Sequence, residues 1–531
     1  MQLVAYGAQD VYLTGNPQIT FFKVVYRRHT NFSVEAIQQT FQGAAEFGRT
    51  VTCNINRNGD LISKMYVVST LKENTRTNWG WVNKLGYAMI ESVKIEIGGS
   101  KIDEQYGDWL NIYHEIARDT SHDSGIDAMI GNVDAVTKIG DGSSTYGEYT
   151  LYTPLQFWFN RNNGLALPLI ALQYHDVRVT MKIREASDLI NYTGSTKPTV
   201  AASEMKDCFL LIDYIYLDSE ERKRFAQAAH EYLIEQVQFT GDETYNAKEL
   251  KMRLNFNHPT KYLAWNYKLD RYTTGTEFVD YAVDGKWDEA LDRFAKKIWL
   301  ASRSSLERGG SSSYSISFGS STLDIGDQPG TTETNATLVA LLAKIDAQIL
   351  FANATTPQAA NDMGDATLGN VVILRNDLTI EDMNYTTAEM DTLISGSAGS
   401  NFILENGVTV RDIFNHSDHM NGVGNPTKTG KLQLNGHDRF STRDGNYFNY
   451  VQPYQHTAVT PADGINVYSF ALNPLEHQPS GTCNFSRIDN ATLNLSTTYS
   501  STYGAGVVSV YAVNYNVLRV MSGMGGLAYS N

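Results

Sequence analysis

Two histidine-containing segments have residue types that could bind a metal ion. His114-Glu115-Ile116-Ala117-Arg118 begins like the zinc-protease helix His-Glu-x-x-His, but Arg118 is a cation and cannot replace the second imidazole ligand. The segment His416-Ser417-Asp418-His419, with Asp412 nearby, would place its histidines at i and i+3 of a helix, with no third ligand fixed by the spacing. A solvated loop is the favoured interpretation of the second segment, and neither is assigned as a metal site.

Glycines and paired carboxylates give no stronger indication of catalysis. Gly523-Met524-Gly525-Gly526 lacks the glycine spacing of a dinucleotide fingerprint and has no helix after it, so we expect a flexible terminal turn. The pairs Asp103/Glu104 and Asp242/Glu243 have no sequence partner that marks one carboxyl as an acid and another as a base. We interpret both pairs as surface charge, and the sequence predicts no catalytic, cofactor-binding or metal-binding residue.

Several asparagines and one short basic group could act at the surface, as glycan acceptors or as a binding patch. Nine Asn-x-Ser/Thr sequons occur, at Asn31, Asn191, Asn335, Asn353, Asn384, Asn415, Asn484, Asn490 and Asn494. The first residues show no secretory signal, so these asparagines are better interpreted as turn residues than as glycan acceptors. Arg27-Arg28-His29 is too small for a nucleic-acid stripe, although it could contact an acidic neighbour or a lipid head group.

Composition indicates a large, strand-rich globular protein with at least two folded units. The chain has 531 residues, 42% hydrophobic and 19% charged, with 31 Tyr and 21 Phe. A net charge of −15 argues against direct binding of nucleic-acid phosphates. Cys53, Cys208 and Cys483 form no disulfide framework or metal spacing and are expected to be small buried residues. We see no stretch of about 18 apolar residues that would span a bilayer.

Short alternating and β-branched runs predict an all-β core. The expected strands are 50–56, 64–70, 93–97, 177–183, 209–217, 251–256, 261–267, 467–472 and 507–513. Between them, Trp109, Ile112 and Ile116 lie at helical spacing within 109–117. This spacing suits a short helix that covers an open end of a β-sandwich.

The chain also repeats itself in order, which predicts two similar halves. Cys53-Asn54-Ile55-Asn56 recurs as Leu254-Asn255-Phe256-Asn257, an offset of 201, and Lys94-Ile95-Glu96-Ile97 recurs as Lys431-Leu432-Gln433-Leu434, an offset of 337. Ile170-Ala171-Leu172 is echoed by Phe470-Ala471-Leu472 at an offset of 300. The changing offsets locate insertions, of which the longest lies in the second half.

Sequence patterns mark the boundary between the two halves, and other patterns mark the long insertion in the second half. Asp218 or Ser219, followed by Glu220 and Glu221, predicts the capped start of a short helix, so we place the boundary near residue 225. The insertion covers about 268–428 and contains two helical patterns, at 287–298 and 338–349, separated by a Ser/Gly-rich tract. We expect it to form a surface subdomain of the second half.

Several long segments of the chain are distinctive. They are 2–10, 16–23, 26–28, 57–60, 165–170, 230–236, 257–266, 478–487 and 516–524, and they include Asn16-Pro17-Gln18-Ile19-Thr20-Phe21-Phe22-Lys23 and Gln478-Pro479-Ser480-Gly481-Thr482-Cys483-Asn484-Phe485. These segments resemble the major capsid proteins of nucleocytoplasmic large DNA viruses, especially those that infect algae, and the likeness is nearly end to end.

This resemblance implies an all-β fold of two tandem eight-stranded jelly rolls, a double jelly roll, with the long partly helical insertion in the second. Residues 1–26 would form an N-terminal arm at the inner base, 27–225 the first jelly roll and 226–531 the second, including the inserted subdomain at about 268–428. It also implies that homotrimers tile the facets of an icosahedral virion shell assembled in the host cytoplasm.

The implied partners are further copies of the chain, minor capsid and penton proteins, and the inner virion membrane on the arm's side, without nucleic acid or a small-molecule substrate. Two alternatives remain open at this point. One is a carbohydrate-active or carbohydrate-binding jelly-roll protein, which would need two facing carboxylates or a metal cluster. The other keeps the fold but makes the chain an internal scaffold or a minor vertex component.

Overall fold

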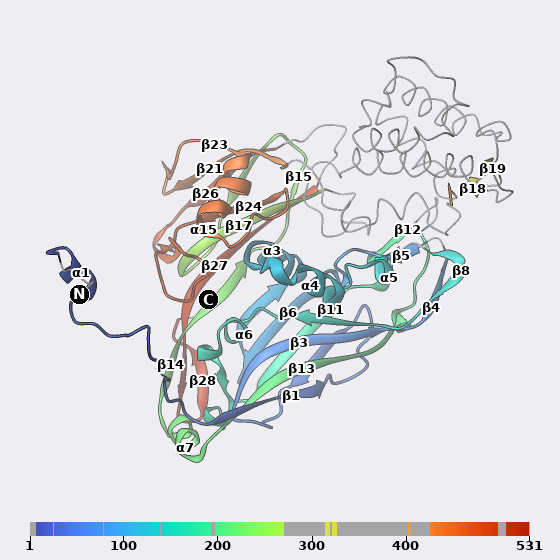
Figure 1. Cartoon of the computed structure of the whole chain (residues 1–531). Helices are drawn as coiled ribbons and strands as arrows, with labels where there is room; N and C mark the ends of the chain where they lie inside the picture. Colours follow the sequence, from blue (N-terminus) through green and yellow to red (C-terminus); the bar gives the residue numbers. More distant parts are fainter. Residues whose placement is uncertain are drawn as a thin grey trace, which may run out of the picture.

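Two β-sandwiches make up most of the chain in the computed structural model, and a thin N-terminal arm stands beside them (Figure 1). The structure describes residues 7–24, 26–77, 79–137, 140–192, 197–269, 314–318, 321–325, 402–403, 425–497 and 506–529. Within these residues, no helix is both long and apolar enough to cross a membrane.

The first sandwich, here called the first roll, is built from two antiparallel sheets. One sheet has the order β1 (Phe32–Thr40), β13 (Met205–Leu217), β3 (Leu61–Leu71) and β10 (Leu167–Pro168), with β9 (Tyr149–Pro154) also paired to β3. The facing sheet has the order β2 (Thr50–Asn54), β11 (Val177–Ile183), β6 (Ile90–Ile97) and β7 (Ser100–Tyr106). On β11 every second side chain is buried, as expected for a strand with one face on the core.

The second sandwich, the second roll, has the same plan. Its sheets have the orders β14 (His230–Phe239), β27 (Gly506–Met521), β17 (Pro259–Leu269), β24 (Ile465–Ser469) and β16 (Glu249–Arg253), β26 (Ala491–Thr497), β21 (Thr427–Leu434), β22 (His437–Asp438). Shorter strands extend them: β15 (Glu243–Tyr245) and β28 (Met524–Leu527) pair with β27, β25 (Cys483–Asn484) with β17, and β23 (Arg443–Asp444) with β21.

The predicted duplication and the all-β double jelly-roll fold are therefore confirmed. In each roll the main path of each sheet has four strands, eight per roll, in matching sequence order. The sequence echoes fall at matching places: Cys53 is in β2 and Leu254 directly follows β16, while Lys94 is in β6 and Lys431 in β21. Three expected strands end early: β2 stops at Asn54, β16 at Arg253 and β24 at Ser469.

Short helices and strands occupy the connections. They are α1 (Asp10–Thr14), β4 (Asn74–Thr77), β5 (Trp79–Trp81), α2 (Leu85–Ala88), α3 (Gly107–Ala117), α4 (Asp123–Ile130), α5 (Asp134–Thr137), β8 (Asp141–Tyr146), α6 (Trp158–Arg161), β12 (Ile190–Tyr192), α7 (Ser219–Gln227), the π-helical turn η8 (Tyr447–Val451) and α15 (Gln452–His456). The predicted boundary helix is confirmed as α7, where the Asp218 carboxylate accepts a 2.9 Å hydrogen bond from the Glu221 N–H.

Most of the predicted insertion lies outside the described residues, and so do both of its expected helices, at 287–298 and 338–349. The described part consists of β18 (Tyr314–Phe318), β19 (Ser321–Ile325) and β20 (Phe402–Ile403), which form a three-stranded antiparallel sheet.

The expectation of a flexible turn at Gly523–Gly526 is wrong. Ser522 and Gly523 turn the chain at positive φ, and β28 then pairs with β27 and packs on the first roll. A Cβ atom on Gly525 would lie 2.7 Å from Leu172 Cδ2 and 3.1 Å from Ile97 Cγ2, so glycine permits this close approach. Sequence spacing could not show this contact, because its partners are more than 300 residues away.

Gly107 gives a test of packing at the start of α3. A Cβ there would lie 2.3 Å from the carbonyl oxygens of both Ile90 and Tyr87, whereas a Cβ on Gly125 in α4 would meet nothing within 4 Å. We expect Gly107→Ala to lower the free energy of unfolding by about 1–3 kcal/mol, and Gly125→Ala to leave it unchanged or raise it by up to about 1 kcal/mol. Urea unfolding followed by circular dichroism measures both, and equal stability of the two variants would contradict the packing at Gly107.

Candidate functional site

The contact between the two rolls, called the seam, combines an apolar cluster with buried ion pairs and hydrogen bonds. On the first-roll side it consists of β7, α3 and α6, and on the second-roll side of β14, β17, β24 and β27 (Figure 1). The relative placement of the rolls determines what surface the chain can offer to other molecules.

Helix α3 forms the apolar part of the seam. The predicted helix at 109–117 is confirmed, and it packs on both rolls, since Leu110 belongs to the core of the first roll. Trp109, Ile112 and Ile116 are fully buried against the outer face of the second roll's sheet. Their partners there are Val237, Tyr262, Ala264, Ile465, Val467, Tyr511 and Val513.

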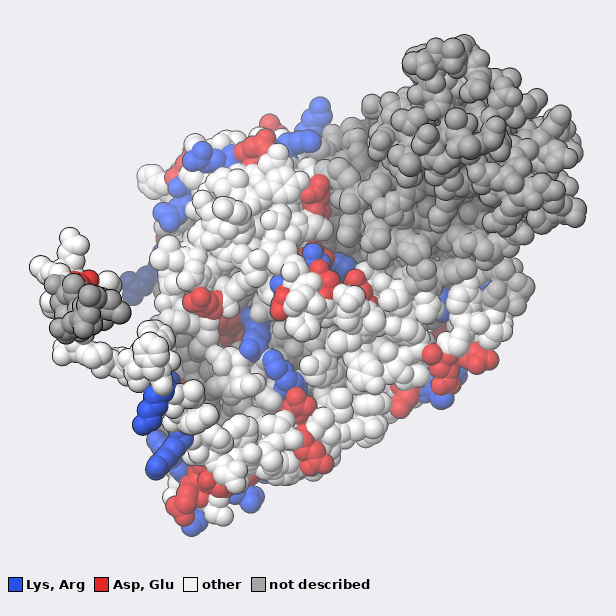
Figure 2. All heavy atoms as spheres, viewed as in Figure 1, with Lys and Arg blue, Asp and Glu red and all other residues white. Residues whose placement is uncertain are grey.

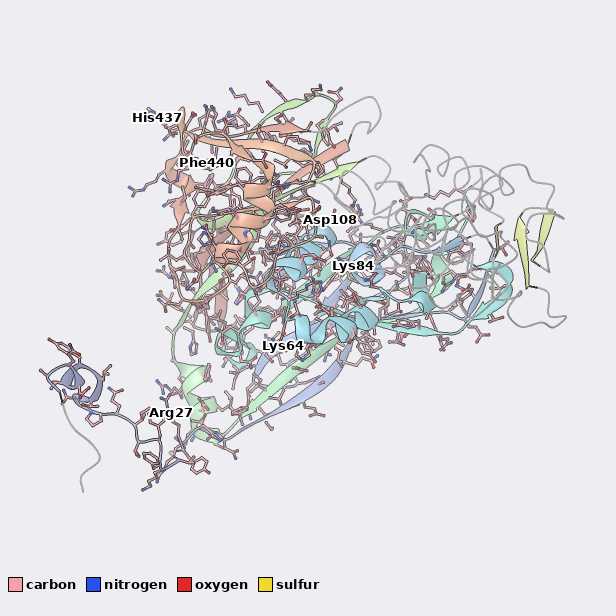
Figure 3. The ribbon with its side chains drawn as sticks, turned by 45° about the horizontal axis from the view of Figure 1, so that its top comes forward. Arg27, Lys64, Lys84, Asp108, His437 and Phe440 are labelled. Atoms are coloured by element: carbon pink, nitrogen blue, oxygen red, sulfur yellow. The ribbon has the colours of Figure 1, made fainter. Side chains whose placement is uncertain are left out.

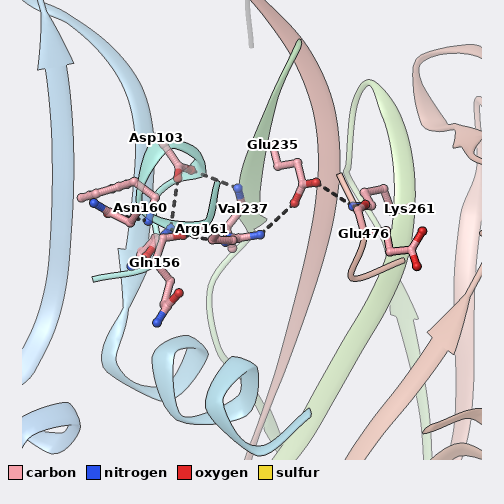
Figure 4. Close-up of polar contacts among 10 residues, drawn as sticks. Asp103, Gln156, Asn160, Arg161, Glu235, Val237, Lys261 and Glu476 are labelled. Atoms are coloured by element: carbon pink, nitrogen blue, oxygen red, sulfur yellow. Dashed lines mark hydrogen bonds and ion pairs between the residues drawn. The ribbon is translucent and has the colours of Figure 1, made fainter. Parts of the chain in front are cut away.

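The polar part of the seam is a buried carboxylate that lies between two cations (Figure 4). Glu235 on β14 accepts from Arg161 of α6 at 2.8 Å and from Lys261 of β17 at 2.7 Å. The Lys261 side chain is only 1% exposed and also donates to the Glu476 carbonyl at 3.1 Å. Because a charge buried without its partner is strongly unfavourable, this triad holds α6 of the first roll to the second roll in one arrangement.

Asp103, one of the carboxylates expected at the surface, is instead buried in the seam (Figure 4). It accepts hydrogen bonds from the Val237 N–H at 3.0 Å and from Gln105 Nε2 at 3.2 Å. Burial raises the pKa of this carboxyl to about 7, although the Val237 hydrogen bond and nearby Arg161 act in the opposite direction. The expectation of surface charge was wrong because β7 turns Asp103 toward β14, whereas the adjacent Glu104 pairs with Lys101.

Glu115, which with His114 begins like a zinc motif, forms another buried ion pair, with Lys84. Burial alone would raise the pKa of Glu115, but Lys84 lies 2.5 Å away and the pKa falls to about 2. The other Glu115 oxygen accepts from the Ala462 N–H of the second roll at 3.4 Å. Burial and then Lys84 lower the pKa of His114 to about 4. These contacts give Glu115 a structural role between the rolls.

A further ion pair, between Lys268 of the second roll and Asp108 of the first roll, adds to the contact between the rolls. Lys268 Nζ lies 3.2 Å from the carboxylate of Asp108, at the start of α3. Figure 3 shows Lys84, Asp108 and Lys64 on the elements where the rolls meet. In the view of Figure 2, charged side chains gather between the two halves, whereas much of the second roll's face is uncharged.

The remaining sequence candidates do not converge on one place. Asp242 accepts a hydrogen bond from Ser509 Oγ on β27, away from Asp103. Cys53 and Cys208 are buried as expected, and Cys483 is half-buried. Asn191 is buried, whereas Asn31, Asn484 and Asn490 are exposed. His416, His419, Asp412, Asp418 and the sequons at 335, 353, 384 and 415 lie outside the described residues. Among the residues that the structure describes, no three His, Cys, Asp or Glu side chains gather as metal ligands.

The N-terminal arm carries the most exposed apolar side chains. Phe22 is 99% exposed, Tyr12 92% and Phe21 88%. From residue 11 to residue 34 the sequence has no Asp or Glu, and it includes Lys23 and Arg27-Arg28. Figure 3 places Arg27 on the arm, apart from the rolls. Apolar groups this exposed are typical of a contact surface, which the sequence indicated through Arg27-Arg28-His29 and through its resemblance.

Models of two capsid protein families match almost the whole chain. The model described as "Major capsid protein N-terminus" matches residues 20–218, and the model described as "Large eukaryotic DNA virus major capsid protein" matches residues 221–526. The two matches meet at α7, between the two rolls.

Individual relatives match over their full length. The chain is 44% identical over 570 residues to the major capsid protein of Phaeocystis pouchetii virus and 37% identical over 556 residues to that of Paramecium bursaria Chlorella virus 1. It is also 40% identical over 600 residues to capsid protein 1 of Acanthamoeba polyphaga mimivirus. Each alignment covers 100% of this chain and 99% of the relative.

Solved structures show the same fold. A chain of the PBCV-1 virus capsid is 33% identical, with a TM-score of 0.61, over 96% of this chain and 100% of that one. The Faustovirus major capsid protein has a TM-score of 0.61 at 13% identity, over 97% of this chain and 94% of that one, which shows the fold alone.

The raised pKa of Asp103 predicts a pH-dependent seam. The folded-state pKa of about 7 exceeds the ordinary 3.8, so the stabilisation is complete below about pH 4 and is lost as pH rises toward 7. At about 1.4 kcal/mol per pKa unit, the loss is roughly 3–4 kcal/mol. We expect the difference in unfolding free energy, wild type minus Asp103→Asn, to fall by that order between pH 4 and pH 7.5. Denaturant unfolding at each pH measures it, and a constant difference would show that the carboxyl is not buried in this way.

Proposed function

We propose, because the chain belongs to the family of large eukaryotic DNA virus major capsid proteins, that three copies form a trimer of near-hexagonal outline and that such trimers tile the facets of an icosahedral virion shell. A major capsid protein of a large DNA virus is a component of the virion shell; the trimer, the tiling and assembly in the host cytoplasm are our proposal.

The observation that carries the proposal is the fixed pairing of two like rolls within one chain. Two sandwiches with the same strand order, joined by buried ion pairs and the apolar face of α3, give each chain two similar units at a set angle. Three such chains would supply six similar units to a closed ring, which approximates sixfold symmetry with threefold contacts. A tile of that shape fills a flat facet without gaps.

We further propose the division expected from the sequence: an arm at 1–26, the first roll at 27–225, and the second roll at 226–531 with the inserted subdomain at about 268–428. The arm, with its exposed aromatic and cationic side chains, would contact minor capsid or penton proteins or the inner virion membrane. We propose no catalysis, cofactor or direct nucleic-acid contact. No observation favours the carbohydrate alternative, because Asp103 and Asp242 lie in separate contacts.

The solution mass of the purified chain tests the trimer. Light scattering with negative-stain images of the same peak should give three times the monomer's 59.1 kDa and hexagonal outlines. A stable monomer at micromolar concentration and neutral pH would contradict the trimer.

Removal of the arm tests the division of labour. We expect a chain lacking residues 1–26 to keep the trimer mass, because no described core residue lies in the arm, and to fail in forming shells or in binding virion extracts stripped of capsid. A matched control replaces Phe21, Phe22 and Tyr26 by Ser in the full chain, which removes the exposed apolar groups but keeps the length. Loss of trimers in either variant would refute the proposal that the arm acts between trimers.

A further inference from the structure

The buried amino group of Lys84 contacts a side-chain amide as well as the carboxylate of its ion pair. Its Nζ donates to Asn111 Oδ1 at 3.0 Å and to Glu115 Oε1 at 2.5 Å. Asn111 and Glu115 lie four residues apart on α3, so their side chains are neighbours on one face of the helix. A primary amine, a primary amide and a carboxyl group therefore meet at one point.

This meeting point is closed to water. Lys84 is 7% exposed, Glu115 4% and Asn111 1%. The second roll closes over it, since the Ala462 N–H donates to the other oxygen of Glu115. Groups held in contact in this way react at an effective concentration that free reactants do not reach.

The backbone holds the amine in place. Lys84 has a φ of 47°, a conformation that a lysine keeps only where its surroundings determine it. Its carbonyl oxygen accepts from the N–H groups of Tyr87 and Ala88, at 3.0 and 3.1 Å, at the start of α2. Gly107 lets α3 approach α2 closely, because a Cβ there would collide with the Tyr87 carbonyl oxygen. The amine and the amide are thus already in contact in the folded chain.

Lys261 of the seam shows what distinguishes Lys84. It is also buried and pairs with a carboxylate, Glu235, at 2.7 Å, but it donates in addition to the backbone carbonyl of Glu476 at 3.1 Å. Attack on a backbone carbonyl would have to cut the chain, whereas attack on a side-chain amide releases only ammonia. Lys84 is in contact with an amide that carries such a leaving group.

We infer that Lys84 and Asn111 become joined by an isopeptide bond, with Glu115 as the carrier of protons. Nζ forms a bond to Cγ of Asn111, the bond from Cγ to Nδ2 breaks, and one molecule of ammonia leaves. Of the three protons on the Lys84 ammonium, one stays on the new amide, one leaves with the ammonia and one remains on Glu115. The reaction occurs once in each chain, uses no cofactor or external substrate, and does not depend on the proposed trimer.

Removal of two buried charges favours the product. A buried ion pair loses hydration that its own attraction only partly restores, whereas the product is a neutral amide beside a neutral carboxyl. Burial alone would raise the pKa of Glu115, but Lys84 lowers it to about 2. The neutral amine that attacks is therefore a minor species, and we expect the bond to form slowly after folding.

The bond would fix the helix that carries the apolar part of the seam. It joins the residue that precedes α2 to the middle of α3, and so closes the chain between residues 84 and 111 into a covalent loop. Such a loop restricts the unfolded chain. Helix α3, which lies on the second roll, could then not separate from α2 of the first roll.

Peptide mapping of the full-length chain tests the bond. Trypsin cleaves after Lys and Arg, so an unlinked chain gives the separate peptides 77–84, 85–94 and 102–118. A linked chain gives a branched peptide in which 77–94 is joined to 102–118, lighter than their sum by one ammonia. We expect this peptide in the purified chain, in an amount that grows over several days at neutral pH. Unlinked peptides alone at the end of that time would overturn the inference.

The map is needed because the mass of the intact chain is ambiguous. An asparagine before a glycine, such as Asn58, loses ammonia when it forms a succinimide, and Gln2 does so when it cyclises as the first residue. Neither reaction joins two peptides. Loss of ammonia confined to such positions would contradict the bond between Lys84 and Asn111.

Glu115→Gln tests the proton carrier, and Glu104→Gln is its matched control. Both residues lie in the peptide 102–118, but Glu104 pairs with Lys101 and is not in contact with Lys84. We expect the branched peptide to form on the order of a hundredfold more slowly in Glu115→Gln and at the wild-type rate in the control. Equal rates in two variants with wild-type circular dichroism would overturn the part given to Glu115. If Glu115→Gln does not fold, the wild-type map still decides whether the bond forms.

Discussion

The burial of Glu235 between Arg161 and Lys261 is the constraint on which the arrangement of the two rolls depends. An ion pair taken out of water gains little over apolar packing, but loss of one member leaves an uncompensated charge that costs about 3–5 kcal/mol. Any rotation of one roll on the other would separate Arg161 from Glu235, since they belong to different rolls. The triad therefore acts less as a source of stability than as a restriction to one geometry.

Apolar packing supplies the area that the ion pairs do not. Trp109 lies against Tyr262 and Tyr511, with ring centroids 6.2 and 5.6 Å apart, so α3 fits one face of the second roll. Sheets of a sandwich usually present one face to water, whereas here the outer face of β27 is buried by a neighbouring roll. In this chain the outer face of a sheet in the second roll is therefore covered by α3 of the first roll.

The sequence predicted what depends on local pattern and failed where a partner had to be known. The alternation of apolar residues predicted β11, the cap at Asp218 predicted α7, and the spacing of Trp109, Ile112 and Ile116 predicted α3. The ordered echoes predicted the repeat. The spacing of the apolar residues in α3 showed that one face of this helix is buried, but it did not show against which sheet that face packs. Asp103 and Gly525 were misread for the same reason, because the strand and side chains that surround them are remote in sequence.

Buried ionisable groups with displaced pKa values often mark catalytic sites, and Asp103, His114 and Glu115 meet that description. Their partners give a different explanation. Asp103 accepts from a backbone amide of the opposite roll, and Glu115 joins Lys84 to the Ala462 amide across the seam. The pKa of Asp103 follows from its burial between the rolls, and the pKa values of His114 and Glu115 follow from burial and from Lys84 of the same roll. These three ionisable groups therefore stabilise the fold and the contact between the rolls, and that role accounts for their displaced pKa values without a substrate.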